Sequence, residues 1–344
     1  MKRLRVHAGW AVVLTIFVAL AGCLSRPAQE PPAPVPSPAP KAPQPVPEYA
    51  PLTGREIGKP IPRRPLAVVI ENAPDARPQS GLFAADFVYE MLAEGGIPRF
   101  LAVFHSGMPD EIGPVRSARP YFIEVARAFG AVLVHAGGSD EANAILAGGD
   151  PPHLDGLAAE GTYFWRSSDR KPPHNLYTSA EKLEAYMAAR GIPQTGQPPR
   201  FSFAPGGPAS LSSDVRPAGR VHITYWGSSP VTYTYAEDRG TYVRATAGKP
   251  DVDRKTQAPI QLSNLVIVRV PHAVVDDAGH LKIDLADVRE AWWVAKGEAV
   301  PVEARWEGNG PYRLFLGSQE VPLVPGTTWV AVLPLRGCDV NFAP

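Results

Sequence analysis

Proline most constrains this chain, because it is concentrated in one stretch that cannot fold as a domain. Eleven prolines lie within residues 27–51, with small residues and few charges between them. Such a composition cannot bury an apolar core and favours polyproline II, which rises about 3.1 Å per residue. We therefore predict a tether over residues 23–63, with a reach on the order of 100 Å if largely extended.

The segment before the tether has the pattern of an export signal. Basic residues precede an apolar run over residues 8–20, which is short for a bilayer span but typical of a signal-peptide core. The run ends in Leu20-Ala21-Gly22-Cys23, which resembles the lipobox of bacterial lipoproteins. That resemblance implies that residues 1–22 are removed and that Cys23 carries acyl chains such as palmitate. Two or more chains anchor a protein stably, so we expect a membrane partner and a lipid-anchored location on its extracytoplasmic face.

The charge balance narrows the class of partner. Without its leader the chain has 31 Lys and Arg against 34 Asp and Glu, a formal net charge of −3. This balance argues against a nucleic-acid partner. With Cys23 lipidated, Cys338 has no intramolecular partner for a disulfide, so stability must come from packing.

Residues 64–190 combine strand-like and helix-like patterns. Short apolar runs at 66–70 and 131–135 are typical of buried strands, and helices are expected over the ranges 120–129, 140–146 and 180–189. We predict an α/β domain with a mixed sheet and helices.

The pattern changes after residue 190. Three prolines mark residues 191–200 as a linker. Residues 201–340 then contain short β-rich runs separated by turns, which predict a β-rich domain built as an antiparallel sheet or small barrel. The predicted strands are 221–226, 231–235, 242–246, 264–270, 292–295, 300–306, 312–316 and 327–333.

A hairpin is predicted within residues 86–105, around the turn Gly95-Gly96-Ile97-Pro98. A helix over 81–93 is the alternative, because apolar residues there also fit the helical period. Pairing Glu94 with Arg99 in the hairpin places a charged set on one face. That set is Glu90, Glu94, Arg99 and His105.

Two arginines stand just before the predicted helix 120–129, in Gly113-Pro114-Val115-Arg116-Ser117-Ala118-Arg119-Pro120. Arg116 and Arg119 would face the positive end of the helix dipole, which costs about 0.3–1 kcal/mol unless a negative group compensates. That group is either the carboxylate or phosphate of a ligand, or a glutamate of the same chain. Active sites and structural ion pairs look alike in sequence, so both interpretations stay open.

Two further polar positions are candidates. His135 ends a predicted strand, where ligands gather in open α/β sheets. His174 and Asn175 lie in residues 164–177, which are dense in polar and aromatic side chains. Standard motifs of serine hydrolases, nucleotide-binding loops and helix-borne zinc sites are missing from the sequence, so we predict no cofactor and no metal. A scattered metal site stays open among His105, His135, His153 and His174.

Many of these motifs fall in the order seen in the YerB-like lipoproteins, a family of bacterial surface proteins with a domain of unknown function in two parts. The chain resembles that family from about residue 64 to its C-terminus, although Pro98 stands where a threonine is expected. The resemblance implies an exported, lipid-anchored protein and supplies no catalytic residues. The motifs include Ala76-Arg77-Pro78-Gln79-Ser80-Gly81-Leu82, Glu94-Gly95-Gly96-Ile97-Pro98-Arg99-Phe100, His135-Ala136-Gly137-Gly138-Ser139, Leu154-Asp155-Gly156 and His174-Asn175-Leu176-Tyr177.

The convergent charges predict a surface protein that binds an anionic or glycan-like ligand, such as a cell-wall polymer. One alternative is an envelope hydrolase or transferase in which Glu90 or Glu94 is the acid or base. Another is a structural protein with a protein partner in an envelope assembly. An open groove lined with arginines would favour the binding protein. A closed cleft with two carboxylates would favour the enzyme, and arginines held in internal ion pairs would favour the structural protein. Candidate ligand-binding residues are Arg99, Arg116, Arg119 and Asn175; candidate catalytic residues are Glu90, Glu94, His135 and His174.

Overall fold

The structure is a computed structural model, which describes residues 48–225, 229–306 and 310–344. These residues belong to one compact unit. The predicted signal peptide, Cys23 and most of the predicted tether lie outside the described residues. Among the helices of the described ranges, none is long and apolar enough to cross a membrane.

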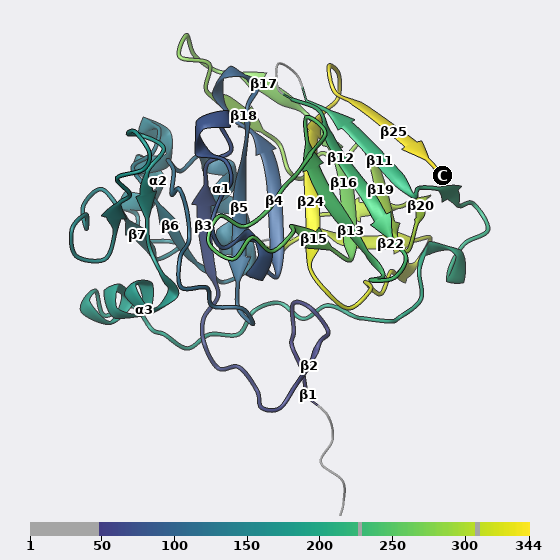
Figure 1. The fold of residues 1–344 in the computed structure, drawn as a ribbon, viewed down its shortest axis with the longest axis horizontal. Helices are drawn as coiled ribbons and strands as arrows, with labels where there is room; N and C mark the ends of the chain where they lie inside the picture. The colour runs from purple at the N-terminus through teal and green to yellow at the C-terminus, as the bar shows by residue number, and fades with distance from the viewer. Residues whose placement is uncertain (1–47, 226–228, 307–309) are drawn as a thin grey trace, which may run out of the picture. The chain divides into compact units, whose positions relative to one another are not determined.

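Strands from both predicted domains share one ten-stranded sheet, in the order β10-β20-β19-β16-β24-β4-β5-β3-β6-β7 (Figure 1). The two halves join where β24 runs parallel to β4, with Trp329 opposite Val88. The N-terminal half supplies β3 (Leu66–Ile70), β4 (Phe87–Leu92), β5 (Pro98–Phe104), β6 (Val132–His135) and β7 (His153–Asp155). The C-terminal half supplies β10 (Arg216–Pro217), β16 (Asn264–Val270), β19 (Glu290–Ala295), β20 (Glu298–Pro301) and β24 (Thr328–Pro334).

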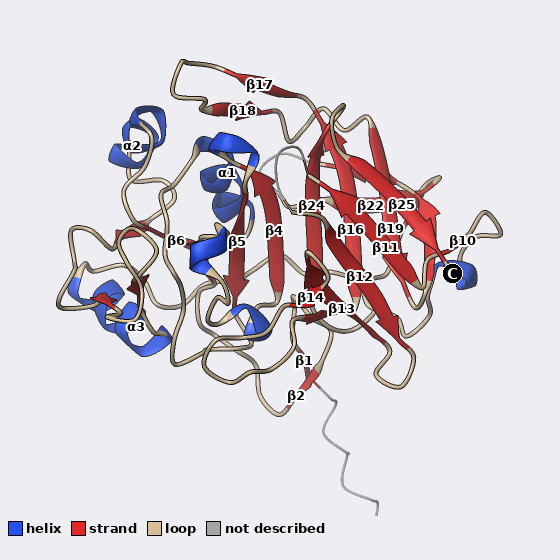
Figure 2. Cartoon of the chain, turned by 45° about the horizontal axis from the view of Figure 1, so that its top comes forward, coloured by secondary structure: helices blue, strands red, loops and turns tan. Residues whose placement is uncertain are grey.

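The α-helices of the described residues all come from the N-terminal half, at the helical segments that the sequence predicts (Figure 2). They are α1 (Pro120–Ala128), α2 (Asp140–Ala147) and α3 (Ala180–Ala189). Ser139 and Ser179 cap α2 and α3 by accepting backbone N–H bonds. The buried face of α1 belongs to the same core cluster as Val69 and Leu101, which lie on one face of the sheet. The large buried side chains of α3 belong to the other cluster, with Val68 and Ala102 of the opposite face. Helices therefore cover both faces of this part of the sheet.

A second sheet covers one face of the C-terminal half, in the order β14-β13-β12-β11-β25. Its strands are β11 (Arg220–Thr224), β12 (Val231–Ala236), β13 (Thr241–Thr246), β14 (Lys249–Pro250) and β25 (Asp339–Ala343), and β15 (Gln261–Leu262) pairs with β13. The β-rich character predicted after residue 200 is confirmed. Smaller sheets pair β1 (Glu48–Tyr49) with β2 (Glu56–Ile57), β8 (Trp165–Arg166) with β9 (Leu176–Tyr177), β17 (His272–Val274) with β18 (Leu281–Ile283), and β21 (Glu303–Arg305) with β22 (Arg313–Leu316) and β23 (Gln319–Glu320).

Residues 48–63, assigned to the tether by composition, are part of the fold. The Leu52 side chain is fully buried in one of the core clusters. Gly54 has a positive φ of 60°, and the Phe203 ring occupies the space that a Cβ on Gly54 would fill. The proline-rich composition ends at Pro51, so the first apolar side chain after it can join the core.

The hairpin of β4 and β5 is confirmed, but its predicted register is wrong. Arg99 lies opposite Met91 rather than Glu94, and Glu90 lies opposite Phe100. The turn takes up more residues than predicted, because Gly95 and Gly96 both adopt positive φ values of 70° and 73°. The shift is by an odd number of residues, so it places Glu90 and Arg99 on opposite faces of the sheet.

Glu90 instead forms a buried ion pair with Arg244 of β13. The Glu90 side chain is 0% exposed and that of Arg244 is 2% exposed. Arg244 Nη2 donates to Glu90 Oε1 at 2.7 Å, and Trp329 Nε1 donates to Glu90 Oε2 at 2.9 Å. Tyr233 OH also donates to that carboxylate, at 3.1 Å. The pair therefore ties β4 of the N-terminal half to both sheets of the C-terminal half.

Replacing Arg244 should destabilise the whole protein. The variant Arg244→Met leaves the Glu90 carboxylate buried without its cation, which costs about 3–5 kcal/mol. Urea denaturation followed by tryptophan fluorescence would measure this loss. Arg216→Met is the matched control, because the guanidinium of Arg216 stacks on Trp292 in an exposed position and its loss should cost less than about 1 kcal/mol. Equal unfolding midpoints for the two variants would contradict the assignment.

Candidate functional site

The parallel strands of the large sheet bring their carboxyl ends to one edge. β3, β6 and β7 are parallel neighbours. Glu71 follows the end of β3, while His135 and Asp155 are the last residues of β6 and β7. Ligands of open α/β sheets bind beyond this edge. The candidate site is therefore built from residues that meet here.

Segment 113–118 crosses this edge and brings Arg116 to it. The Arg116 backbone N donates to the Val69 carbonyl of β3 at 2.9 Å, and its carbonyl accepts from the Ala136 N just after β6 at 3.0 Å. On the other side, Val115 N donates to the Leu176 carbonyl at 2.7 Å. These backbone bonds hold together four segments that lie far apart in the sequence.

Glu71, Arg116 and His174 form the partly exposed polar group of the site. Glu71 Oε1 accepts from Arg116 Nε at 3.1 Å, and Glu71 Oε2 lies 2.9 Å from His174 Nδ1. The Glu71 side chain is 7% exposed, while those of Arg116 and His174 are 26% and 22% exposed. Within the described residues, the two Nη atoms of Arg116 and the Nε2 of His174 have no hydrogen-bond partner. Glu71 thus holds two partly exposed side chains whose other nitrogens have no partner among the described residues.

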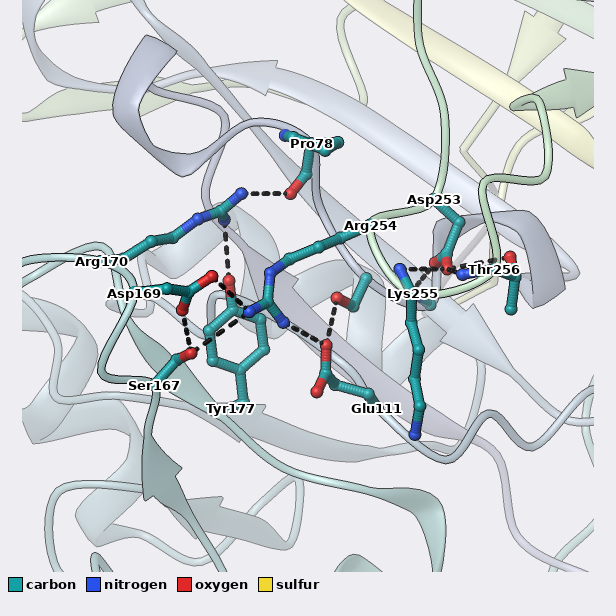
Figure 3. A network of polar contacts seen from close by, with 12 residues as sticks. Pro78, Glu111, Ser167, Asp169, Arg170, Tyr177, Asp253, Arg254, Lys255 and Thr256 are labelled. Atoms are coloured by element: carbon teal, nitrogen blue, oxygen red, sulfur yellow. Dashed lines mark hydrogen bonds and ion pairs between the residues drawn. The ribbon is translucent and has the colours of Figure 1, made fainter.

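Residues on both sides of His174 in the sequence are held by the contacts drawn in Figure 3. Arg170 donates to the Pro78 carbonyl and to the Tyr177 hydroxyl, both at 2.7 Å. Arg254, from the C-terminal half, donates to Asp169 at 2.6 Å. The same guanidinium donates to Glu111 at 2.7 Å and lies over the Tyr177 ring. Both halves of the chain therefore position His174.

Glu94 is the negative group that compensates Arg119, the second of the two arginines before α1. Its Oε1 accepts from Arg119 Nε at 2.5 Å and its Oε2 from Arg99 Nη2 at 3.0 Å. The Arg119 and Arg99 side chains are only 8% and 12% exposed. Burial raises the pKa of Glu94. The hydrogen bond from Arg119 and the positive charges of Arg99 and Arg119 together lower it by more, so the pKa lies below its ordinary value. Arg99 and Arg119 are therefore held in an internal ion-pair cluster.

The remaining candidates are either paired with other groups of the protein or buried in it. His135 Nδ1 lies 2.8 Å from the Gly137 carbonyl and its Nε2 lies 2.9 Å from His153 Nδ1, and burial lowers its pKa. Asn175 donates to the Ser167 and Arg170 carbonyls, so it shapes the loop around His174. Glu90 is enclosed in its pair with Arg244, and His105 is fully buried. In the described ranges, no group of three or more His, Cys, Asp or Glu side chains is placed to hold a metal ion.

The predicted candidates thus do not form one shared site, and one site residue was missed. Arg116 and His174 come together, whereas Glu90, Arg99 and Arg119 do not join them in a shared cleft. Glu71 was missed because it lies in a loop rich in turn residues. Its position directly after the first buried strand was the available signal, because that is a strand's carboxyl end.

Comparison with known proteins defines the family. The N-terminal domain of a protein of unknown function, DUF3048, matches residues 52–193, and the corresponding C-terminal domain matches residues 221–330. The chain therefore belongs to this two-part family. It is 38% identical over 290 residues to the putative lipoprotein YerB of Bacillus subtilis (strain 168), covering 83% of this chain and 86% of that protein. A crystal structure of YerB from Bacillus subtilis matches with a TM-score of 0.77 at 34% identity, covering 86% of this chain and 99% of that chain. The YerB-like resemblance is confirmed.

The lowered pKa of Glu94 predicts acid sensitivity. A carboxylate whose pKa is depressed in the folded state stabilises the protein above its unfolded pKa, and this contribution is lost as the pH falls through the folded value. Glu94→Gln should therefore be less stable than the wild type at neutral pH, with the difference shrinking as the pH falls below about 4.5. Urea unfolding at a series of pH values would measure it.

Glu184→Gln is the control for this experiment, because Glu184 is exposed on α3 and forms no ion pair with a described residue. Its stability should track that of the wild type at every pH. A difference between wild type and Glu94→Gln that stays constant on acidification would contradict the role given to the Glu94 charge.

Proposed function

We propose that the protein is an exported, lipid-anchored envelope protein that binds an anionic group of an envelope ligand through Arg116 and His174. The observation that carries the proposal is that Arg116 Nη1 and Nη2 and His174 Nε2 lack partners among the described residues, on side chains that are 26% and 22% exposed. Glu71 holds both side chains from behind. A ligand would then meet donors whose orientation is already fixed, which lowers the entropic cost of binding.

The unused hydrogen-bonding atoms of this group support an anion rather than a cation. Both oxygens of Glu71 are engaged by Arg116 and His174, so the side-chain atoms of the group that lack partners among the described residues are nitrogens. A guanidinium with two free Nη atoms suits carboxylate or phosphate oxygens. An anionic wall polymer, with a carboxylate or phosphate on each repeat, has the required chemistry.

The cellular location belongs to the same proposal. The relative YerB is described as a putative lipoprotein, and the lipobox-like sequence ends at Cys23 of this chain. Lipidation of Cys23, after removal of residues 1–22, would anchor the protein on the extracytoplasmic side of a membrane. The proline-rich residues before the fold would then serve as a spacer between the membrane and the binding site.

The second candidate function is that of a hydrolase or transferase, but with His174 as the acid or base in place of Glu90 or Glu94. Glu90 is buried away from solvent and Glu94 is held by two arginines, so neither is proposed as the acid or base. His174 is better placed, because a carboxylate at its Nδ1 leaves Nε2 as a proton acceptor when the ring is neutral. A structural role with a protein partner is supported only by the internal pairing of Arg99 and Arg119.

Polymer binding tests the proposal. The full chain, anchored in neutral phosphatidylcholine vesicles, would be titrated with poly(glycerol phosphate), polygalacturonate and uncharged dextran. We expect binding of one or both anionic polymers and none of dextran. Arg116→Gln should weaken binding about ten- to hundredfold, because a hydrogen bond to a charged group contributes about 1.5–3 kcal/mol. Vesicle co-sedimentation would measure the dissociation constant.

Arg127→Gln is the matched control, because the Arg127 side chain is 30% exposed and pairs with Asp150 on the surface. It should bind like the wild type, and thermal unfolding should show both variants folded. Equal losses in the two variants, or no binding of either anionic polymer by the wild type, would overturn the proposal. Release of low-molecular-weight products from a bound polymer, abolished by His174→Gln, would establish the enzyme instead.

A further inference from the structure

A second region of the same sheet edge has the form of a ligand pocket. β16, β24 and β4 are parallel neighbours, so their carboxyl ends also meet at one edge. A pocket of about 710 Å³ lies there, between the ends of these strands and the hairpin β17–β18. Figure 1 shows this hairpin at the opposite end of the fold from β1 and β2. The volume is within the range of small-molecule sites, about 300–1,000 Å³.

The pocket is predominantly apolar and open to solvent. Val274 and Leu335 line it and are 60% and 43% exposed, and the neighbouring Val275 is 51% exposed. These are three of the six large hydrophobic side chains that are exposed in the described residues. Apolar surface gathered in a concavity marks a binding site far more often than single exposed residues do. The walls therefore suit an alkyl or prenyl chain.

The rim carries positive charge. Arg336 lines the pocket, is exposed and forms no ion pair with a described residue. Ala93 and Gly95, on either side of Glu94, also line it, and Glu94 belongs to the cluster with Arg99 and Arg119 that retains one positive charge. His280 lies 4.0 Å from Glu94 and pairs with Asp276 at 2.6 Å. Arg336, which lines the pocket without a carboxylate partner among the described residues, therefore favours an anionic headgroup over a cationic one.

From the apolar walls and the basic rim we infer that this pocket binds an amphipathic lipid with one long apolar chain and an anionic headgroup. The chain would lie against Val274, Leu281 and Leu335, and the headgroup would meet Arg336. This site is separate from the one formed by Arg116 and His174, so either proposal can fail without the other. A lipid-anchored protein is held close to a source of such molecules.

Photo-labelling in vesicles tests the inference. The full chain, anchored in phosphatidylcholine vesicles, would be illuminated with a diazirine-bearing hexadecyl phosphate, and with the same alkyl chain carrying a trimethylammonium head. Mass spectrometry would locate the adducts. We expect the phosphate probe to label peptides covering residues 271–281 and 334–336 preferentially, by about tenfold over the cationic probe. Arg336→Gln should remove this preference for the phosphate head.

Two neighbouring valines provide the decisive comparison. Val274→Asp places a charge on the pocket wall and should reduce labelling of these peptides about tenfold, because an alkyl chain would have to bury that charge. Val275→Asp changes a neighbour that does not line the pocket, so labelling should stay within about twofold of the wild type. Both positions are exposed, and Leu335→Asp serves as a second pocket variant if Val274→Asp unfolds. Equal labelling by both probes, equal effects of the two valine variants, or adducts spread evenly over the surface would overturn the inference.

Discussion

The buried ion pair between Glu90 and Arg244 is the interaction on which the rest of the structure depends. A carboxylate in the middle of β4 has no access to water, so it requires a partner of opposite charge at the same depth. That partner comes from β13, and Tyr233 and Trp329 donate the remaining hydrogen bonds. Such a pair adds little net stability over apolar packing but strongly penalises any arrangement that separates its members. It therefore specifies how the two halves of the chain meet.

The meeting of the two halves has a direct consequence for the candidate site. With β24 placed beside β4, loop 251–257 of the C-terminal half reaches the loop that carries His174. Arg254 then clamps that loop through Asp169. The loop that carries His174 is thus held by Arg254, which lies more than eighty positions from Asp169 in the sequence.

Three groups pair a glutamate with one or more arginines, and they differ in how far their side chains are buried. Glu90 and its partner Arg244 are both buried, so their charges stabilise the fold and do not meet solvent. At Glu94 the carboxylate is 20% exposed, but two arginines occupy both of its oxygens. At Glu71 the carboxylate is nearly buried, whereas its partners Arg116 and His174 are about a quarter exposed and have unused nitrogens. This third group is the one that we propose as the ligand site.

The sequence predicted local structure well and long-range pairing poorly. Strands β3 and β16 have the predicted bounds, and the need for a negative group beside Arg119 was predicted from the helix dipole. The hairpin register was missed because consecutive left-handed glycines lengthen the turn, and an odd shift moves Glu90 to the other face. The pairing of β24 with β4 was not predictable, because apolar periodicity identifies a buried strand without naming its neighbour. The partners of Glu71 were not predictable for the same reason, since they come from distant segments.

We propose that Arg116, which is 26% exposed, meets the anion, whereas Arg99 and Arg119, at 12% and 8% exposed, are too buried to do so. Nuclear magnetic resonance of the arginine Nε–Hε groups, recorded while inorganic phosphate and then poly(glycerol phosphate) are added, tests it most directly. The account predicts that the Arg116 signal shifts progressively with the polymer and that the Arg99 and Arg119 signals stay in place. Shifts at Arg99 and Arg119 with none at Arg116 would contradict it and would move the ligand site to the Glu94 cluster.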